Sequence, residues 1–388
     1  MTSTTQSTTQ EQAIPAQHPR PNAAGGIADI EGGRGYLRTA GYHRSPADIP
    51  LPAALVRTYG LRRGDQVEGS AAAGAGGGRR ATESPLAVVT TINGLPADQA
   101  RRRPHFDDLT PLYPSERLRL EDGDASATAR IIDLIAPIGK GQRGLIVAPP
   151  KAGKTMILKA IARAVATAHP EAHLMLVLVG ERPEEVTDLR RSVRGEVVYS
   201  TFDESPADHI RVAELAIERA KRLAELGRDV VVLLDSLTRL GRAYNLAAPA
   251  SSRTLTGGVA ASALQPPRQF LGAARNLEEG GSVTIVSTAL IDTGSALDSV
   301  LFEEFKGTGN MELRLRRDLA ERRLYPAIDP APSGTRREDL LMEPAEHAAV
   351  VSLRRALASL DPQRAVELLL DKTRDGNGPF LHQLQAAR

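Results

Sequence analysis

Residues 148–155, APPKAGKT, are the part of this 388-residue sequence most able to perform chemistry. They follow the pattern of a phosphate-binding loop, with Ala148 in place of the first glycine. In such a loop, backbone N–H groups and the following helix N-terminus hold phosphate oxygens. Lys154 would then reach the β- and γ-phosphates, and the Thr155 hydroxyl would ligate Mg²⁺. The segment therefore predicts a site for ATP and Mg²⁺.

A carboxylate elsewhere in the chain can complete the magnesium shell. Asp235 ends the apolar run VVVLLD, residues 230–235. A lone aspartate at the end of a strand usually serves as a cap, but beside a phosphate-binding loop it matches the Walker B carboxylate. We therefore expect Asp235 to hold Mg²⁺ together with Thr155.

Hydrolysis also requires a group that orients or deprotonates the attacking water. Glu181 follows the apolar run 173–180 at the edge where ligands of open α/β sheets collect. Arg182 beside it could contact phosphate. The segment GERPEEV is equally typical of a solvated helix start with acidic first residues. The residues alone leave both interpretations open.

The segments around these residues predict an α/β domain that positions them. Apolar runs at 143–148, 173–180, 229–236 and 282–291 alternate with helical patterns. Apolar strands that alternate with helices predict a mostly parallel sheet covered on both faces. The last fifty residues predict two or three amphipathic helices.

The N-terminal part has a different texture. Short apolar runs broken by Gly and Pro predict a small β-barrel. The expected organisation is a disordered tail at 1–25, the barrel at 26–100 with a low-complexity hairpin loop at 69–84, a connector at 101–128, the ATPase unit at 129–345 and C-terminal helices at 346–388.

Composition excludes several classes of protein. The chain has no cysteine, so disulfides, thiol nucleophiles and thiolate metal sites are excluded. The N-terminus lacks a signal-peptide pattern, and no apolar run is long enough for a transmembrane helix, so we expect a cytoplasmic protein without a membrane partner. The net charge of +2 does not by itself indicate a nucleic-acid binder.

Longer motifs resemble a known family. APPKAGKT, GERPEEV, STFDESPADH, LLDSLTRLGRAYN, EEFKGTGNMEL and YPAIDPAPSGTRREDLL closely resemble the bacterial transcription termination factor Rho family, and the match runs over about residues 26–345. The resemblance implies a homohexameric, RecA-like, RNA-dependent ATPase and helicase with an OB-fold, cold-shock-like barrel. Such a ring translocates along single-stranded nascent RNA and dissociates the RNA polymerase elongation complex.

The resemblance also implies roles at the nucleotide site. Glu181 takes the role of the catalytic carboxylate, Arg336 that of an arginine finger for a neighbouring subunit, and Arg323 that of a second arginine across the interface. Tyr325 stands where the family places a ring against adenine. The implied nucleotide-binding residues, with Arg182, are Gly139, Lys140, Gly141, Gln142, Arg143, Gly144, Lys151, Ala152, Gly153, Lys154, Thr155 and Met156.

In the barrel, GRGYLR (33–38) occupies the family's paired-aromatic strand. Tyr36 keeps one stacking platform, while Arg34 and Pro50 stand where further aromatics are expected. Arginine can stack on a base through its guanidinium plane, so an altered site can persist. The residues implied to bind RNA here are Gly33, Arg34, Gly35, Tyr36, Leu37, Arg38, Asp48, Ile49 and Pro50.

Two loops are implied to line the central RNA channel of the ring. The first, 248–258, has Arg253 in place of a lysine, and the second, 292–299, has Ala296 where a lysine is expected. Lys306 is retained. Because each phosphate contact adds to the salt dependence of binding, a channel with fewer cations predicts a shallower dependence.

Two other functions use the same motifs. A rotary or secretion-type ATPase subunit would hydrolyse ATP without RNA, and it has no use for an RNA-binding barrel. A non-catalytic RNA-binding or antitermination protein would keep the phosphate-binding loop only for structure and show no turnover. We expect the RNA-dependent motor, because Lys154, Thr155, Glu181, Asp235 and Arg336 are all present.

Overall fold

The fold is that of a computed structural model, which describes residues 23–72, 84–121 and 125–386. Its N-terminal unit is an antiparallel sheet of order β3-β2-β1-β4-β5-β6. The sheet curls until β3 contacts β5, and Leu37, Val67 and Ile92 fill its core. The strands are β1 (Ala23–Glu31), β2 (Arg34–Arg38), β3 (Ile49–Leu51), β4 (Gln66–Ala71), β5 (Leu86–Ile92) and β6 (Leu95–Pro96). The predicted OB-like barrel is confirmed.

The boundaries of the barrel differ from the expected ones. Residues 23–25 belong to β1 and pair with β4, so the barrel begins earlier than residue 26. Residues 1–22 of the predicted tail lie outside the described residues. Strand β4 extends to Ala71 and pairs with β5, so the low-complexity segment joins two paired strands, although its residues 73–83 are also outside the described part. Helices α1 (Ala53–Tyr59) and α2 (Ala97–Ala100) pack against β2 and β5 of this sheet, respectively.

The second unit is built on a mixed sheet of order β10-β9-β11-β15-β8-β16-β17, in which only the last of these strands is antiparallel. Two short strands, β14 (Arg275–Leu277) and β7 (Pro111–Leu112), extend it from β15. The four predicted strands are adjacent in its centre, which confirms the mostly parallel α/β sheet. The strands on the main path are β8 (Arg143–Ala148), β9 (His173–Glu181), β10 (Glu196–Thr201), β11 (Asp229–Asp235), β15 (Ser282–Leu290), β16 (Met311–Leu315) and β17 (Ile328–Thr335).

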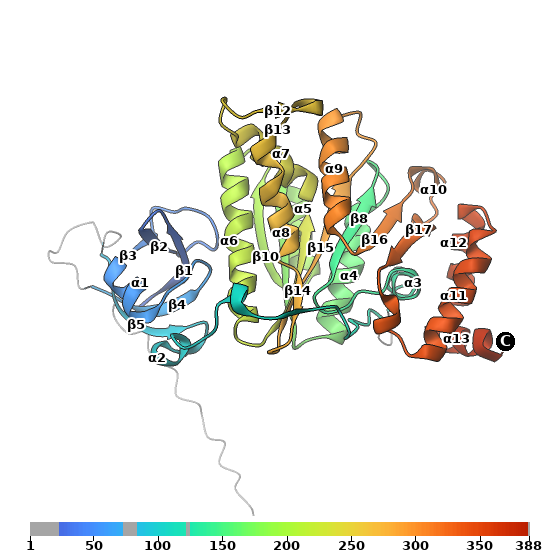
Figure 1. Ribbon diagram of the computed structural model, residues 1–388, viewed down its shortest axis with the longest axis horizontal. Coiled ribbons are helices and arrows are strands. Elements are labelled where there is room, and N and C mark those ends of the chain that lie inside the picture. Colours follow the sequence, from blue (N-terminus) through green and yellow to red (C-terminus); the bar gives the residue numbers. More distant parts are fainter. Residues whose placement is uncertain (1–22, 73–83, 122–124, 387–388) are drawn as a thin grey trace, which may run out of the picture.

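Helices cover both faces of this sheet (Figure 1). On β9, Leu176 packs into one core with α3, α4 and α5, while Val177 packs into the other with α6 to α9. This alternation follows from the two-residue period of a strand. The helices are α3 (Ala127–Ile135), α4 (Lys154–Ala168), α5 (Pro183–Ser192), α6 (Pro206–Ala224), α7 (Leu237–Ala247), α8 (Gln265–Gly272), α9 (Ala296–Thr308) and α10 (Arg317–Glu321).

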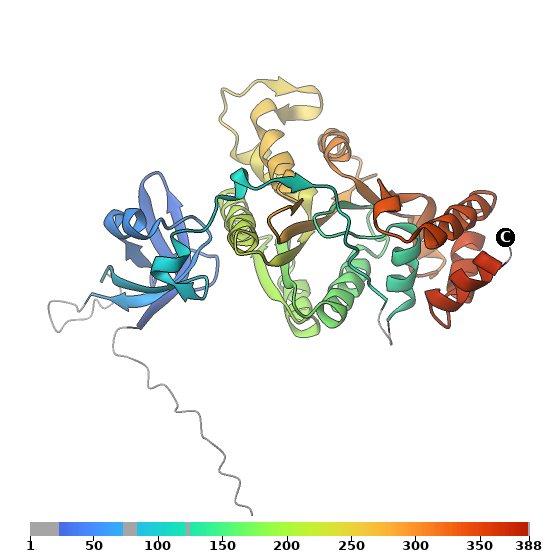
Figure 2. The same ribbon diagram turned by 60° about the horizontal axis from the view of Figure 1, so that its bottom comes forward.

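Three helices follow, α11 (Pro344–Ala358), α12 (Pro362–Lys372) and α13 (Asn377–Ala386), beside α3 and β17. The predicted connector packs onto the α/β unit, because its residues Leu118 and Leu120 are buried in the core of that unit. The barrel lies beside α6 in both views (Figures 1 and 2). Within the described part of the chain, no helix has the length and apolar character needed to cross a membrane.

Candidate functional site: a nucleotide site and an RNA-binding pocket

The phosphate-binding loop lies between the end of β8 and the start of α4. Gly153 caps α4 with a φ of +90°, in the left-handed region that favours glycine, and Lys151 has a φ of +67°. A Cβ at Gly153 would lie 3.3 Å from the Tyr325 ring, so that ring packs directly against the loop. The first backbone N–H groups of α4, which can bind phosphate, thus lie beside an aromatic ring that can contact a base.

Lys154 bridges the two predicted carboxylates. Its Nζ lies 2.5 Å from Asp235 Oδ1 and 3.0 Å from Glu181 Oε1. Strands β9 and β11 are neighbours, and their carboxyl ends bring Glu181 and Asp235 to one edge of the sheet. Both carboxylates are almost fully buried. Because the charges are paired, their burial is tolerated, and a phosphate would compete with them for Lys154.

Burial and charge tune this cluster. Burial lowers the pKa of Lys154, but the charges of Asp235 and Glu181 outweigh it and hold the pKa above its ordinary value. Burial raises the pKa of Glu181, and the charge of Asp235 raises it further against the opposing charges of Lys154 and Arg239. A carboxylate with a raised pKa is a better proton acceptor, as a general base requires.

Two residues of the site were not foreseen. Arg239 on α7 lies with its Nη1 3.4 Å from Glu181 Oε2 and also donates to the Gly180 carbonyl. Thr288 on β15 donates to Asp235 Oδ1 at 2.8 Å. A hydroxyl within an otherwise apolar strand is a usable signal for Thr288, whereas nothing local in the sequence marks Arg239.

The remaining loop residues are placed around this cluster. Thr155 is half-buried in the first turn of α4, while Lys151, Met156 and Arg182 are exposed at the loop and at the start of α5. The Thr155 hydroxyl and the Asp235 carboxylate are oxygen ligands of the kind that Mg²⁺ prefers. No group of three or more His, Cys, Asp or Glu in the described residues could hold a metal alone. The donor set therefore fits a Mg²⁺ that shares its shell with phosphates.

Residues 139–144 do not lie beside the phosphate-binding loop of the same chain. They precede or begin β8, whereas the loop follows its far end. Arg143 donates to the carbonyls of Thr308 and Ala274, and Gln142 binds Asn310. A Cβ on Gly141, with φ +88°, would clash with the backbone at Asn276. Within one chain the segment thus packs against Ala274, Asn276, Thr308 and Asn310, and its predicted contact with a nucleotide stays a prediction.

Arg336 lies at that same far edge. It follows Thr335, whose partner Met311 is level with Gly144 near the start of β8. Each strand residue advances about 3.3 Å, so the four steps from Gly144 to Ala148 place Arg336 about 13 Å or more from its own loop. Arg336 is exposed, and among the described residues its guanidinium has no hydrogen bond or ion pair. It is therefore available to a second copy of the chain.

Tyr325 and Arg323 follow α10. The Tyr325 ring is half-buried against the loop, and its hydroxyl donates to the Ala320 carbonyl at 3.4 Å. Arg323 has a φ of +61° and an exposed side chain. The structure thus places Tyr325 against the phosphate-binding loop and leaves Arg323 at the surface.

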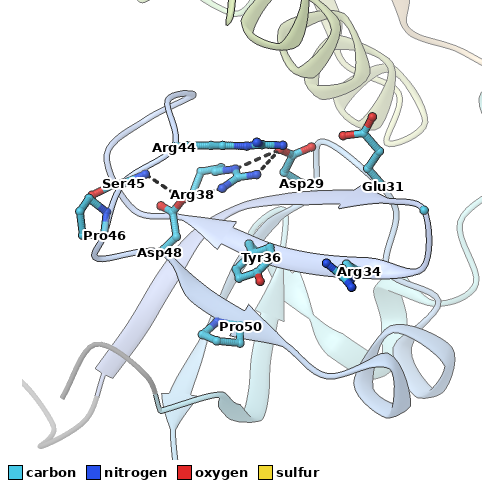
Figure 3. A pocket seen from close by; sticks show the side chains of 11 residues that line it. Asp29, Glu31, Arg34, Tyr36, Arg38, Arg44, Ser45, Pro46, Asp48 and Pro50 are labelled. Carbon is cyan, nitrogen blue, oxygen red and sulfur yellow. Dashed lines mark hydrogen bonds and ion pairs between the residues drawn. The ribbon is translucent and has the colours of Figure 1, made fainter. Parts of the chain in front are cut away.

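The barrel carries a pocket of about 760 Å³ formed by β1, β2, β3 and the loop after β2 (Figure 3). Tyr36 lies on its floor, 39% exposed, with Pro50 as its cross-strand neighbour. Arg34 lies further along β2 and is exposed. Arg34 and Arg44 make no ion pair among the described residues, so two free cations and one aromatic face line the pocket. Such a combination binds single-stranded nucleic acid.

Arg38 and Asp48 line the pocket but are engaged with other residues. The Arg38 guanidinium donates to Asp29 Oδ2 at 2.6 Å and to Asp48 Oδ2 at 2.5 Å (Figure 3). Arg38 also lies with its Cζ 5.6 Å from the centre of the Tyr36 ring. These hydrogen bonds hold the Arg38 and Asp48 side chains in place in the pocket wall without a ligand.

Four other predicted barrel residues do not present side chains to the pocket. The Leu37 side chain is buried in the barrel core and the Ile49 side chain packs against the same core, so any RNA contact of these two residues would be through the backbone. Alternate residues of a strand point to opposite faces, so Leu37 must face away when Tyr36 faces the pocket. Gly35 packs on Leu51, and Gly33 forms the turn before β2 with a φ of +80°.

The two predicted channel loops lie together. Gly257 approaches the Ala296 carbonyl, so the hairpin of β12 (Thr254–Leu255) and β13 (Val259–Ala260) packs beside the start of α9. Arg253 and Ala296 are both exposed there. Lys306 is exposed in the last turn of α9, about 15 Å along the helix from Ala296. The structure brings Arg253 and Ala296 to one place but not Lys306.

Comparison with known proteins yields two family models. Residues 23–98 match the "Rho termination factor, RNA-binding domain", and residues 128–335 match the "ATP synthase alpha/beta family, nucleotide-binding domain". The chain is 59% identical to "Transcription termination factor Rho" of Streptomyces lividans over 93% of this chain and 51% of that protein. It is 55% identical to the Streptosporangium roseum protein of the same name over 98% of this chain and 99% of that one. The chain thus spans about half the length of some relatives and nearly all of others.

Solved structures share the fold. An ATPase from the type III secretion system of pathogenic bacteria has a TM-score of 0.57 at 22% identity, covering 72% of this chain and 82% of that chain. The ATP synthase subunit NeqB has a TM-score of 0.53 at 20% identity, covering 64% and 63%. At these identities the likeness establishes the ATPase fold and nothing further.

Proposed function

The chain belongs to the transcription termination factor Rho family, and on that premise we propose that it is an RNA-dependent ATPase that moves along nascent RNA and terminates transcription. The observation that carries the proposal is the cluster of Lys154 with Glu181 and Asp235 in a chain that also holds the Tyr36 pocket. One site can supply energy and the other can grip RNA.

The proposed mechanism begins with competition for Lys154. Phosphate oxygens of ATP take the Nζ from the two carboxylates. Asp235 and Thr155 would hold a Mg²⁺ shared with the phosphates, and that ion would neutralise phosphate charge. Glu181, released from Lys154 but still beside Arg239, orients and deprotonates the attacking water. Tyr325 fixes the base against the loop.

The proposal includes a ring of identical subunits, which is a homohexamer. Because Arg336 lies at the opposite end of β8 from its own loop, it can stabilise transition-state charge only in a neighbouring subunit. Hydrolysis then depends on assembly, and each turnover links two subunits. Movement of the loops at Arg253 and Ala296 would carry RNA through the ring and pull it from the elongation complex of RNA polymerase.

The test is ATP-dependent displacement of a DNA strand from an RNA that carries a single-stranded extension. We expect displacement with ATP and none with a non-hydrolysable analogue. ATP hydrolysis without displacement would overturn the translocase.

A second candidate is an ATPase that works without RNA, for which the nucleotide-binding domain matched over residues 128–335 would suffice. The match to an RNA-binding domain over residues 23–98 weighs against it. Equal turnover with and without RNA would favour this second candidate.

A further inference from the structure

Arg63 joins the barrel pocket to the ATPase unit. Its Nε donates to Asp29 Oδ1 at 3.0 Å, and its Nη1 lies 3.0 Å from Glu214 Oε2 on α6. The other oxygen of Asp29 holds Arg38 in the pocket wall. One guanidinium thus binds a pocket carboxylate on one side and a motor carboxylate on the other.

The contact continues to α7. Glu214 Oε1 accepts a hydrogen bond of 2.8 Å from the Tyr244 hydroxyl. Burial, with the charge of Glu214, raises the pKa of Tyr244, so this hydroxyl stays protonated and donates. Tyr244 is therefore tied to the barrel through two buried or half-buried polar contacts.

Helix α7 touches both other functional regions. It begins after Asp235, and its Arg239 pairs with Glu181. Its Asn245 accepts from Ala260 N–H at 2.7 Å in the hairpin that carries Arg253. Its Arg242 forms a two-point pair with Asp298 on α9. A small shift of α7 would therefore move the partners of Glu181 and of both predicted channel loops at the same time.

We propose that Arg63 is a positioning residue that couples occupancy of the barrel pocket to the orientation of α7, and so to Glu181. This inference rests on the proposed function. RNA that contacts Arg38 changes how Asp29 is shared between Arg38 and Arg63. The change passes to Glu214, which binds Arg63 through one carboxylate oxygen and Tyr244 through the other, and so reaches Tyr244. The guanidinium suits this position because two of its nitrogens, Nε and Nη1, each bind one of the two carboxylates, whereas a lysine offers a single point charge to both.

Its neighbour Arg62 provides a matched control. Arg62 Nη1 pairs with Glu225 of the motor at 2.8 Å and donates to the Pro104 carbonyl, but it has no contact with Asp29. Both arginines dock the barrel on the motor. Only Arg63 also holds the pocket wall.

The experiment measures linkage between RNA and nucleotide binding, so it does not depend on hydrolysis. The chain has no tryptophan, so Tyr36→Trp places a single tryptophan in the pocket, and its fluorescence reports base stacking. Cytidine and uridine tetranucleotides are titrated with and without a non-hydrolysable ATP analogue. In this reference protein we expect the analogue to change the RNA Kd by about 5- to 150-fold, the usual range of coupling.

In the Tyr36→Trp protein, a second substitution Arg63→Ala should reduce the change in RNA Kd caused by the analogue to less than about twofold. Tyr244→Phe should reduce it similarly. The double variant should lose no more than either single variant, because both act in one chain of contacts. Arg63→Lys keeps the charge and guards against an unfolded Arg63→Ala protein, and it should also lose coupling. Arg62→Ala should retain the coupling.

Full coupling in Arg63→Ala, equal loss in Arg62→Ala, or no coupling in the reference protein would overturn the inference. Failure of the proposed function appears differently. Coupled binding without RNA-stimulated hydrolysis in the wild-type chain would contradict the motor and leave the role of Arg63 in place.

Discussion

Lys154 Nζ lies 2.5 Å from Asp235 Oδ1, although the two residues are 81 positions apart in the chain. The contact exists because β8 and β11 flank β15 in a parallel sheet, so their carboxyl ends open at one edge. The same edge receives Glu181 from β9. The relative positions of Lys154, Asp235 and Glu181 are therefore fixed by the pairing of the strands in the sheet.

Replacing Glu181 with Gln should lower kcat by about 10²- to 10⁴-fold, the usual contribution of a general base. ATP binding should persist, because Lys154 and the loop remain. The control is Glu184→Gln, an exposed carboxylate in the first turn of α5. Normal turnover in Glu181→Gln would remove Glu181 from the mechanism.

The pH profile of kcat should report Glu181. Burial and Asp235 raise its pKa above 4.5, and a base acts only when deprotonated, so activity should fall on the acid side at a pH above that value. Arg239 opposes this rise, so Arg239→Gln should move the acid limb to still higher pH. A limb that moves to lower pH in this variant would contradict the assignment.

Variants of Lys154 and Arg336 should complement each other. Lys154→Ala and Arg336→Ala subunits should each be inactive alone, because every interface lacks one group. Mixed in equal amounts in a ring, about a quarter of the interfaces combine an intact loop with an intact finger. Recovered turnover after mixing is the measurement. Activity of Arg336→Ala alone would show that no finger is needed.

Tyr36→Ala should weaken RNA binding at the barrel by about 1–3 kcal/mol, the value of one stacked base. Arg34→Ala should instead reduce the slope of log K against log salt by about one, as loss of a phosphate contact does. The two effects separate stacking from charge. If Arg34→Ala lowers affinity equally at all salt concentrations, Arg34 acts by stacking.

The contact between Tyr42 of the barrel and Glu196 should make stability depend on pH. Burial raises the pKa of Glu196, but hydrogen bonds from His173 and Tyr42 outweigh it and lower the value below 4.5. A lowered carboxyl pKa gives stability that is present above about pH 4.5 and is lost as pH falls through the folded-state value. Glu196→Gln should therefore lower Tm at pH 7 by a few degrees, and less below pH 4.

The control for that prediction is Glu171→Gln, because the Glu171 side chain is 60% exposed and its pair with His169 should contribute little. Equal Tm values for wild type and Glu196→Gln at pH 7 would count against the barrel contact, as would a difference that grows on acidification.

Much of the fold could be predicted because its signals are local. Continuous apolar runs predicted the four central strands, and they are adjacent in the sheet. Strand β10 was missed because EVVYST is only partly apolar. Strand β17 was missed because IDPAPSGT contains two prolines and a glycine, which normally break strands. It is the last strand of the sheet, where proline is tolerated.

The site was only partly predictable. The loop with Lys154, and the strand ends at Glu181 and Asp235, follow from pattern and sheet geometry. Arg239 and Thr288 come from separate elements, and only the folded chain brings them to those carboxylates. The burial of the Leu37 side chain could have been predicted, since it alternates with Tyr36 on one strand. The position of Arg336 relative to the loop required the register of β16 and β17.

The most direct test of the account is ATP hydrolysis by the purified chain with and without poly(C) or poly(U). We predict that RNA raises turnover strongly and that Tyr36→Ala requires a higher RNA concentration for the same stimulation. Equal turnover without RNA, or no turnover under either condition, would contradict an RNA-dependent motor.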